Sequence, residues 1–427
     1  MPKPRTESAI PVAPPAAHGP AAIITRRASD KLRAGSLWIY RSDVTQLIPA
    51  LGTAAPEPGA LLTVLDSRGI PLGTALYSSA SQITLRIVSS TPALTRAAYL
   101  DDVRTRTRAA LALRREILAE SPDTNACRLL FSEADNLPGI LADRYHDLVL
   151  LQLLTQGTAQ DDLRAVLTEE FRNEFSPAAI WERPDPRIRE LEQLAPPAAG
   201  PLFAAGDART ATEFTLNGLQ FRYDAASGQK TGAFLDQRLN YLAAARHAHG
   251  RALDVCTYQG GFALHLARVC ERVTGVDASR SALEVADQNM ELNRAHLLNS
   301  GDGVDWIEAD AFELLRDYEA TGERFGTIVL DPPAFAKSKN ATEGALRGYK
   351  EMNLRALKML EPGGTLVTCS CSHHISLQDF TAAIASAAAD AGRRVRLIET
   401  RGAAPDHPEI LTLPETIYLK CLILKVI

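Results

Sequence analysis

The chain has 427 residues and a formal net charge of −5, with 46% hydrophobic and 23% charged residues. These values are typical of globular proteins and exclude a wholly disordered chain. At about 150 residues per domain, the length predicts about three domains. No apolar run approaches the ~20 residues of a membrane helix, so we expect no membrane contact.

Cysteine content and the N-terminal sequence indicate the compartment. The six cysteines are too sparse for a disulfide scaffold, and no two are spaced as C-x-x-C. The first residues lack the apolar core of a signal peptide. We therefore expect a reduced, cytoplasmic setting.

Charge is distributed unevenly along the chain. Residues 1–120 hold 15 basic and 9 acidic side chains, a balance of +6, whereas the remainder has a balance of −11. Because positive charge attracts phosphates, the N-terminal part is a candidate for contact with a polyanion such as RNA. The alternative is a solvated, arginine-rich surface.

The N-terminal elements predict a tail and a small β-domain. Residues 1–22 contain six prolines and many alanines, and they cannot bury enough apolar surface to fold, so we expect a disordered tail. Residues 23–95 consist of short apolar runs separated by turns, which predicts strands in a compact barrel. The clearest of these runs lie at 61–65, 74–77 and 82–88.

Residues 96–126 are predicted to form a linker helix, with the strongest helical pattern over 102–118. Its polar face is expected to carry Arg104, Arg106, Arg108, Arg114 and Arg115. These side chains form either a stripe that faces phosphates or a solvated face, and we favour the solvated face.

Two further domains follow the linker. Residues 127–225 mix strands with one helix, and the elements are expected at 148–154, 161–171, 178–182 and 221–223, with a loop insert at 196–200. In residues 226–427 short apolar strands alternate with helices, which predicts an α/β, doubly wound sheet covered on both faces. Its strands are expected at 252–256, 272–276, 304–307, 327–330, 365–368, 395–399 and 418–425, with helices at 281–293 and 349–358 among those between them.

Three acidic residues follow the first three strands of this sheet. Asp254 ends the first strand before a turn with Gly260 and Gly261, and Asp277 and Asp310 follow the next two strands. The turn is not G-x-G-x-x-G, so a dinucleotide site is disfavoured. Carboxylates at the carboxyl ends of neighbouring strands suit ribose hydroxyls and a cationic nucleoside. This series predicts a site for S-adenosylmethionine.

The fourth strand ends in Asp331-Pro-Pro-Ala-Phe335, where two prolines stiffen the turn and remove two N–H donors. We expect Asp331 to be held at the mouth of the cleft, with a planar base over the prolines. The alternative is an ordinary strand-end turn. Lys337 and Lys339 could contact phosphates or be exposed loop residues.

The fifth strand ends in Cys369-Ser-Cys371-Ser-His373-His374. The cysteines could be small buried hydrophobes, or part of a zinc cluster, although no second ligand pair is evident and we expect no metal. A third interpretation is a nucleophile. C5 of cytosine is a poor nucleophile until a thiolate adds to C6, so a cysteine here fits C5 methylation of a pyrimidine.

At this point the sequence resembles the bacterial large-subunit ribosomal RNA cytosine-C5 methyltransferase I family. The segments that carry the resemblance span nearly the whole chain after the tail: 131–139, 228–238, 254–262, 330–339, 370–373, 404–408 and 413–420. The resemblance implies an N-terminal PUA domain, a central mixed α/β domain and a C-terminal Rossmann-like class I methyltransferase domain. It also implies ribosomal RNA as partner and a homodimer.

The resemblance also suggests roles for individual residues. Asp254, Gly260, Gly261, Asp277, Asp310 and Asp331 would line the cofactor cleft, and Gln229, Thr231, Phe234 and Arg238 would form its lid or edge. Cys371 matches the family's cysteine and would be the nucleophile, with Cys369 as runner-up. Trp38, Arg26, Arg27 and Arg33 would lie on the RNA-binding surface. Ala334 stands where related enzymes have a second cysteine, so Cys369, water and Asp331 stay open as the final base.

Two other functions stay open. The Asp-Pro-Pro-aromatic turn also suits methylation of an exocyclic amine, which needs no cysteine. The chain could instead be a ribosome-assembly factor that binds RNA without catalysis.

Overall fold

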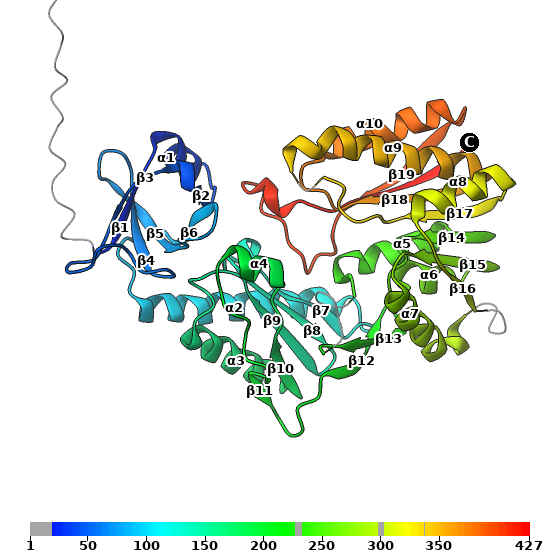
Figure 1. Ribbon diagram of the computed structural model, residues 1–427. Helices are drawn as coiled ribbons and strands as arrows, with labels where there is room; N and C mark the ends of the chain where they lie inside the picture. The colour runs from blue at the N-terminus through cyan, green and yellow to red at the C-terminus, as the bar shows by residue number, and fades with distance from the viewer. Residues whose placement is uncertain (1–18, 227–232, 298–302, 337) are drawn as a thin grey trace, which may run out of the picture.

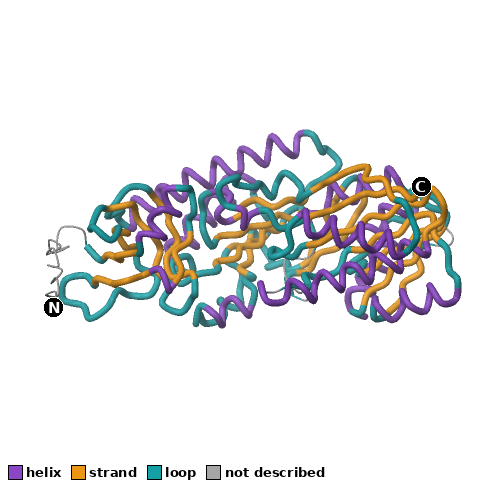
Figure 2. Tube along the Cα trace, turned by 90° about the horizontal axis from the view of Figure 1, so that it is seen from above, coloured by secondary structure: helices purple, strands orange, loops and turns teal. Residues whose placement is uncertain are grey.

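The computed structural model describes residues 19–226, 233–297, 303–336 and 338–427. Three sheet-containing parts follow one another from the N-terminus to the C-terminus in an elongated arrangement (Figures 1 and 2). Residues 1–18 of the predicted tail lie outside the described residues. The tail ends earlier than predicted, because Ala21 and Ala22 are buried in the first strand.

The N-terminal part is a six-stranded sheet in the order β2-β6-β5-β4-β1-β3. Its elements are β1 (Ala21–Ile24), α1 (Arg26–Arg33), β2 (Trp38–Tyr40), β3 (Val44–Ile48), β4 (Leu61–Leu65), β5 (Pro71–Tyr77) and β6 (Ile83–Ser89). The prediction of strands alone missed α1. This helix buries only Ala28 and Ser29, so it has no apolar period to reveal it, and Thr25 caps it by accepting from Ala28 N.

The central part is a five-stranded sheet in the order β11-β10-β9-β8-β7. Its elements are α2 (Arg96–Ala119), β7 (Ala126–Phe131), β8 (Ile140–Tyr145), β9 (Leu148–Leu153), α3 (Asp161–Phe175), β10 (Ala179–Glu182), α4 (Pro186–Leu191) and β11 (Phe203–Ala204). Apolar side chains of α2 and α3 pack on one face of this sheet.

The arginines of α2 face acidic side chains of the protein itself. Arg108 and Arg115 pair with Glu170 and Glu174 of α3, with shortest N–O distances of 2.7 Å in both pairs. Arg104 and Arg106 likewise contact carboxylates. These ion pairs support the solvated face over a stripe that contacts phosphates.

Arg114 does not lie on the polar face of α2, so the prediction for this residue is wrong. It lies on the buried face, one helical turn after Ala110, and is 1% exposed. Asp135 binds its guanidinium through two oxygens at 2.6 and 2.7 Å, which compensates the buried charge.

A hairpin links the central sheet to the C-terminal part. Strands β12 (Ala211–Leu216) and β13 (Leu219–Asp224) meet at Asn217-Gly218, where both residues have positive φ, as a tight hairpin turn requires. Aromatic residues of the hairpin pack between the central sheet and helices α5 (Arg238–His247) and α6 (Gly261–Leu266). One continuous apolar core therefore joins the two parts.

The C-terminal part is a seven-stranded sheet in the order β16-β15-β14-β17-β18-β20-β19. The strands are β14 (Arg251–Val255), β15 (Arg272–Asp277), β16 (Val304–Glu308), β17 (Phe325–Leu330), β18 (Leu360–Ser370), β19 (Val395–Arg401) and β20 (Lys420–Val426). All neighbours are parallel except β20, which is antiparallel to β18 and β19. The predicted strands are all present, although β18 begins at Leu360 because it pairs with Phe325 of β17.

Helices cover both faces of this sheet (Figure 1). Helices α5, α6 and α7 (Arg280–Leu292) lie on one face, and α8 (Ala311–Thr321), α9 (Thr342–Met359) and α10 (Leu377–Asp390) lie on the other. The strand order reverses between β14 and β17. Ligands of open α/β sheets bind at such a reversal, beyond the carboxyl ends of the strands.

Candidate active site

A cavity of about 570 Å³ lies at this reversal, within the size range of small-molecule sites. Five residues predicted for the site line it: Phe234, Asp277, Asp310, Asp331 and Cys371. The sequence interpretation missed several others: Asp236, Gln237, Cys256, Tyr258, Phe312, Met352, Tyr418 and Leu419. Family-like segments of the sequence could have revealed six of them: Asp236 and Gln237 in 228–238, Cys256 and Tyr258 in 254–262, and Tyr418 and Leu419 in 413–420.

Asp254 lies beneath the cavity rather than in its wall. Its buried Oδ2 accepts from Thr257 Oγ1 at 2.5 Å and from Ala263 N at 2.9 Å, so it ties the loop after β14 to the start of α6. Its Oδ1 is buried and has no hydrogen-bond partner among the residues that the structure describes. Burial, and then the charge of Asp277, raise the pKa of Asp254 to about 7 against the lowering effect of its hydrogen bonds.

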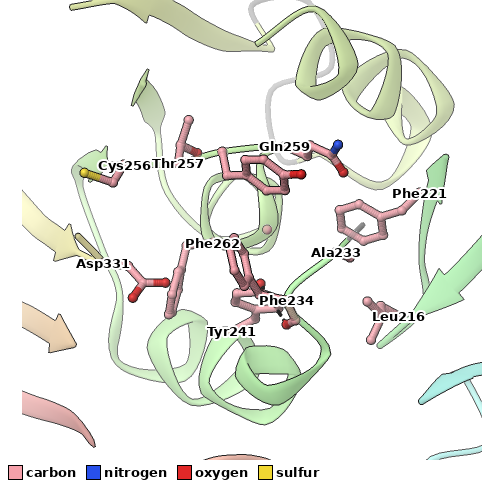
Figure 3. Close-up of a pocket in the computed structure, with 12 residues that line it drawn as sticks. Leu216, Phe221, Ala233, Phe234, Tyr241, Cys256, Thr257, Gln259, Phe262 and Asp331 are labelled. Atoms are coloured by element: carbon pink, nitrogen blue, oxygen red, sulfur yellow. Dashed lines mark hydrogen bonds between the residues drawn. The ribbon is translucent and has the colours of Figure 1, made fainter. Parts of the chain in front are cut away.

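The turn between Asp254 and α6 is sharp, and packing requires a glycine at position 261. Cys256, Tyr258 and Gly260 all have positive φ, at 66°, 51° and 85°. A Cβ on Gly261 would lie 2.6 Å from the ring of Tyr241, so no larger residue fits there without movement. Gly261 lines a smaller pocket beside the main cavity, in which Figure 3 shows Asp331 next to the ring of Phe262.

Asp277 and Asp310 stand at the ends of neighbouring strands. Asp277 accepts from the backbone N–H of Tyr258 and of Ser279, both at 2.9 Å. Asp310 caps α8 by accepting from Phe312 N and Glu313 N through Oδ1. Both side chains are thus held by backbone donors while they line the cavity.

Asp331 is a carboxyl poised to hold a proton near neutral pH. Burial raises its pKa to about 8, and the nearby carboxyls of Asp236 and Asp254 add to this rise. Gln237 opposes it by donating from Nε2 to Asp331 Oδ2 at 3.0 Å. Below pH 8 the side chain is therefore mainly a neutral acid that can donate.

The two cysteines of β18 and its end differ in access. Cys371 lines the cavity, and its thiol donates to the carbonyl of Pro332 at 3.9 Å. Burial, with Asp331 and Asp236, raises its pKa to about 11, which the charge of Lys420 partly opposes. Cys369 is 0% exposed, does not line the cavity and pairs in register with Cys421.

The four residues predicted for the lid or edge of the cleft have different outcomes. Gln229 and Thr231 lie outside the described residues. Phe234 is exposed at the cavity edge and packs edge-on against Tyr258. Arg238 is instead 0% exposed and pairs with Asp406 at 3.2 Å, behind the site.

Loss of the Arg238 charge should destabilise the protein. Arg238→Met removes the arginine that pairs with the buried Asp406, which among the described residues keeps only His407 at 3.6 Å as a paired side chain, and we expect the free energy of unfolding to fall by about 3–5 kcal/mol. Urea unfolding measures the loss. Arg26→Met is the control, because the Arg26 side chain is 90% exposed and should leave the urea midpoint unchanged. Equal midpoints for both variants would contradict the importance of the buried pair.

Several residues expected on an RNA-binding surface form hydrogen bonds or ion pairs with other side chains of the protein. Trp38 Nε1 donates to Glu133 of the central part at 2.7 Å. Arg27 and Arg33 pair with Asp43 and Asp66, although both arginines keep roughly half or more of their side-chain surface exposed. Trp38 therefore helps to join the N-terminal and central parts.

Two further features of the described residues bear on other classes of site. Among these residues, none of the helices is long and apolar enough to cross a membrane. No group of three or more His, Cys, Asp or Glu side chains in the same ranges is placed to hold a metal ion.

Comparison with known proteins agrees with this geometry. The family of S-adenosylmethionine-dependent methyltransferases matches residues 133–424, and a PUA-like domain matches residues 22–90. The chain is 38% identical over 387 residues to ribosomal RNA large subunit methyltransferase I of Klebsiella pneumoniae (strain 342), covering 90% of this chain and 92% of that one. It is 37% identical over 389 residues to the protein of that name from Escherichia coli (strain SMS-3-5 / SECEC), covering 90% and 93%.

Solved structures show the same fold. A methyltransferase, SMU.776, complexed with SAH has a TM-score of 0.77 at 18% identity, covering 95% of this chain and 99% of that one. A SAM-dependent methyltransferase from Streptococcus mutans has a TM-score of 0.76 at 19% identity, with the same coverage. The chain therefore belongs to the S-adenosylmethionine-dependent methyltransferases, in the family of ribosomal RNA large subunit methyltransferase I.

Proposed function

We propose that the protein methylates C5 of a cytidine in large-subunit ribosomal RNA, with Cys371 as the nucleophile and Asp331 as the acid. The observation that carries the proposal is that both side chains line the cavity that also holds Asp277 and Asp310. The names of the relatives supply the RNA class. The PUA-like domain would add a grip on RNA that does not depend on sequence.

The residues of the cavity fit S-adenosylmethionine. Asp277 and Asp310 offer acceptors at the ends of neighbouring strands, and Phe312, Pro332 and Pro333 offer apolar surface for a flat base. When bound, S-adenosylmethionine supplies an electrophilic methyl group. Gly261 allows Tyr241 to pack against the loop that borders this site.

The remaining chemistry belongs to the protein and the target base, which must leave its stack to enter the cavity. Cys371 loses its proton to water, and its thiolate adds to C6 while Asp331 gives its proton to N3. The electron pair that this releases at C5 would form the bond to the methyl carbon that S-adenosylmethionine supplies, and the old bonding pair would stay on the donor sulfur. Loss of the C5 proton to water re-forms the C5–C6 double bond and expels the Cys371 thiolate, and N3 returns its proton to Asp331.

The accessibility of the cysteines supports this assignment. Cys369, the alternative nucleophile and one candidate for the final base, has no exposed surface. Cys371 lies next to Pro332 of the Asp-Pro-Pro turn, whose carbonyl it contacts.

Nucleoside mass spectrometry on RNA from a strain that lacks the protein tests the proposal. We expect 5-methylcytidine to vanish from one position of large-subunit ribosomal RNA, and wild type but not Cys371→Ala to restore it. Loss of a methylated amine instead would establish methylation of an exocyclic amine. An unchanged RNA, together with no binding of S-adenosylmethionine, would support the assembly factor.

We also propose that the protein works as a cytoplasmic homodimer, as the family resemblance suggests. Sedimentation of the purified protein at micromolar concentration should give the mass of two chains. A single-chain mass would overturn this part of the proposal without affecting the chemistry.

A further inference from the structure

Gln237 stands in a chain of hydrogen bonds that ends on Asp331. Gln237 Nε2 donates to Asp331 Oδ2 at 3.0 Å, and Asn240 Nδ2 donates to Gln237 Oε1 at 2.7 Å. Arg401 Nε donates in turn to Asn240 Oδ1 at 2.8 Å. Gln237 and Asn240 are only 2% and 1% exposed, so solvent scarcely competes for these groups.

The direction of each bond follows from the chemistry of arginine. A guanidinium only donates, so Asn240 must present its oxygen to Arg401 and its NH2 group to Gln237. The same NH2 group donates to the carbonyl of Gly402 at 3.0 Å, which agrees with this orientation. Gln237 must then present its oxygen to Asn240 and its NH2 group to Asp331. Asp331 Oδ2 is therefore an acceptor.

A carboxylic acid that accepts a hydrogen bond from an amide at one oxygen is free to carry its proton on the other. We propose that Gln237 is a positioning residue that keeps Oδ2 of Asp331 as the acceptor and so reserves Oδ1 for the proton given to N3 of the target base. This inference rests on the proposed function. Asn240 and Arg401 do not line the cavity, so they act through Gln237.

Other groups around Asp331 shift its pKa, whereas the assignment of the proton to one oxygen rests on the Gln237 bond alone. The carboxyls of Asp236 and Asp254 raise its pKa, and the thiol of Cys369 opposes them by hydrogen bonding, as Gln237 does. Among the described residues, the charge of Asp331 in turn raises the pKa values of Tyr241, Cys256, Cys369 and Cys371. Loss of the Gln237 bond should therefore raise the pKa of Asp331 above about 8.

Two variants test the direction of the hydrogen bonds that lead from Arg401 to Asp331. Gln237→Leu removes the donor to Asp331. Asn240→Asp is nearly isosteric and lies outside the cavity, but its carboxylate accepts from both neighbours, so Gln237 must turn and present its oxygen to Asp331. The proton of Asp331 is then drawn to Oδ2, the wrong oxygen.

The readout is release of tritium from large-subunit ribosomal RNA transcribed with 5-tritiated cytidine, without a methyl donor. Addition of a thiolate to C6 and of a proton to N3 lets the C5 hydrogen exchange with water. We expect both variants to release tritium about ten- to hundredfold more slowly than wild type, the scale of a misplaced catalytic group. The pH above which the rate stops rising should also move above 8.

Gln156→Leu is the matched control, because it removes a buried glutamine amide that contacts Ser79 and Glu192, far from the site. It should release tritium at the wild-type rate, and melting temperatures show that all variants fold. If wild type releases tritium and both variants keep its rate and pH profile, the positioning role is wrong. If wild type releases none and forms no 5-methylcytidine, the proposed function itself fails.

Discussion

Cys371→Ala should lower the rate of 5-methylcytidine formation by at least about ten-thousandfold, the scale on which enzymes lose activity without their nucleophile. The thiol lines the cavity beside the Asp-Pro-Pro turn, where it can form the bond to C6 that activates C5. Single-turnover assays with purified protein, S-adenosylmethionine and large-subunit ribosomal RNA that lacks the modification measure the loss.

Cys369→Ser is the matched control for this result. It changes the neighbouring buried thiol to a hydroxyl that can still donate to Asp331, so we expect the rate to stay within about tenfold of wild type, because even complete loss of one hydrogen bond costs only about 1 kcal/mol. RNA that contains 5-fluorocytidine should form an adduct stable to denaturing electrophoresis with wild type and Cys369→Ser, but not with Cys371→Ala. The reverse pattern would make Cys369 the nucleophile.

Asp331→Asn should lower the rate by about a hundred- to ten-thousandfold at neutral pH, the usual contribution of a general acid. Asparagine can still donate a hydrogen bond to N3 and accept from Gln237, but it cannot give up a proton. The variant therefore separates proton transfer from hydrogen bonding. A rate within a factor of a few of wild type would show that no proton passes from Asp331.

The pH profile of tritium release without a methyl donor distinguishes the two groups. The reactive form needs Cys371 deprotonated and Asp331 protonated, with pKa values of about 11 and about 8. Below pH 8 the thiolate fraction rises tenfold per unit, so the wild-type rate rises. Above pH 8 the loss of protonated Asp331 cancels that gain, and the rate levels off.

Asp331→Asn should lack this plateau. Its rate depends on the thiolate alone and continues to rise past pH 8, until Cys371 itself is titrated. Loss of the Asp331 carboxyl also lowers the pKa of Cys371. The rate of the variant therefore stops rising at a lower pH than the pKa of the wild-type Cys371 thiol would predict. A plateau at the same pH in both proteins would assign the pKa of about 8 to another group.

Local patterns in the sequence determined much of the fold. Strand and helix periods predicted the alternating elements of residues 226–427, and the positions of Asp277, Asp310 and Asp331 at strand ends placed them at one edge of the sheet. Parallel strands share that edge, so residues far apart in the chain could be assigned to one cavity without knowledge of their contacts. The resemblance added Cys371, which the structure places in the same cavity.

Only the tertiary structure decided which polar residues face the ligand and which support the fold. Arg238 reads as an edge residue, yet it pairs with Asp406, 168 positions later in the chain. Gln237 is its neighbour, yet it reaches Asp331 across 94 positions. A side chain's partners depend on how distant segments pack and on whether each buried charge or amide can be satisfied there, and neither period nor composition contains that information.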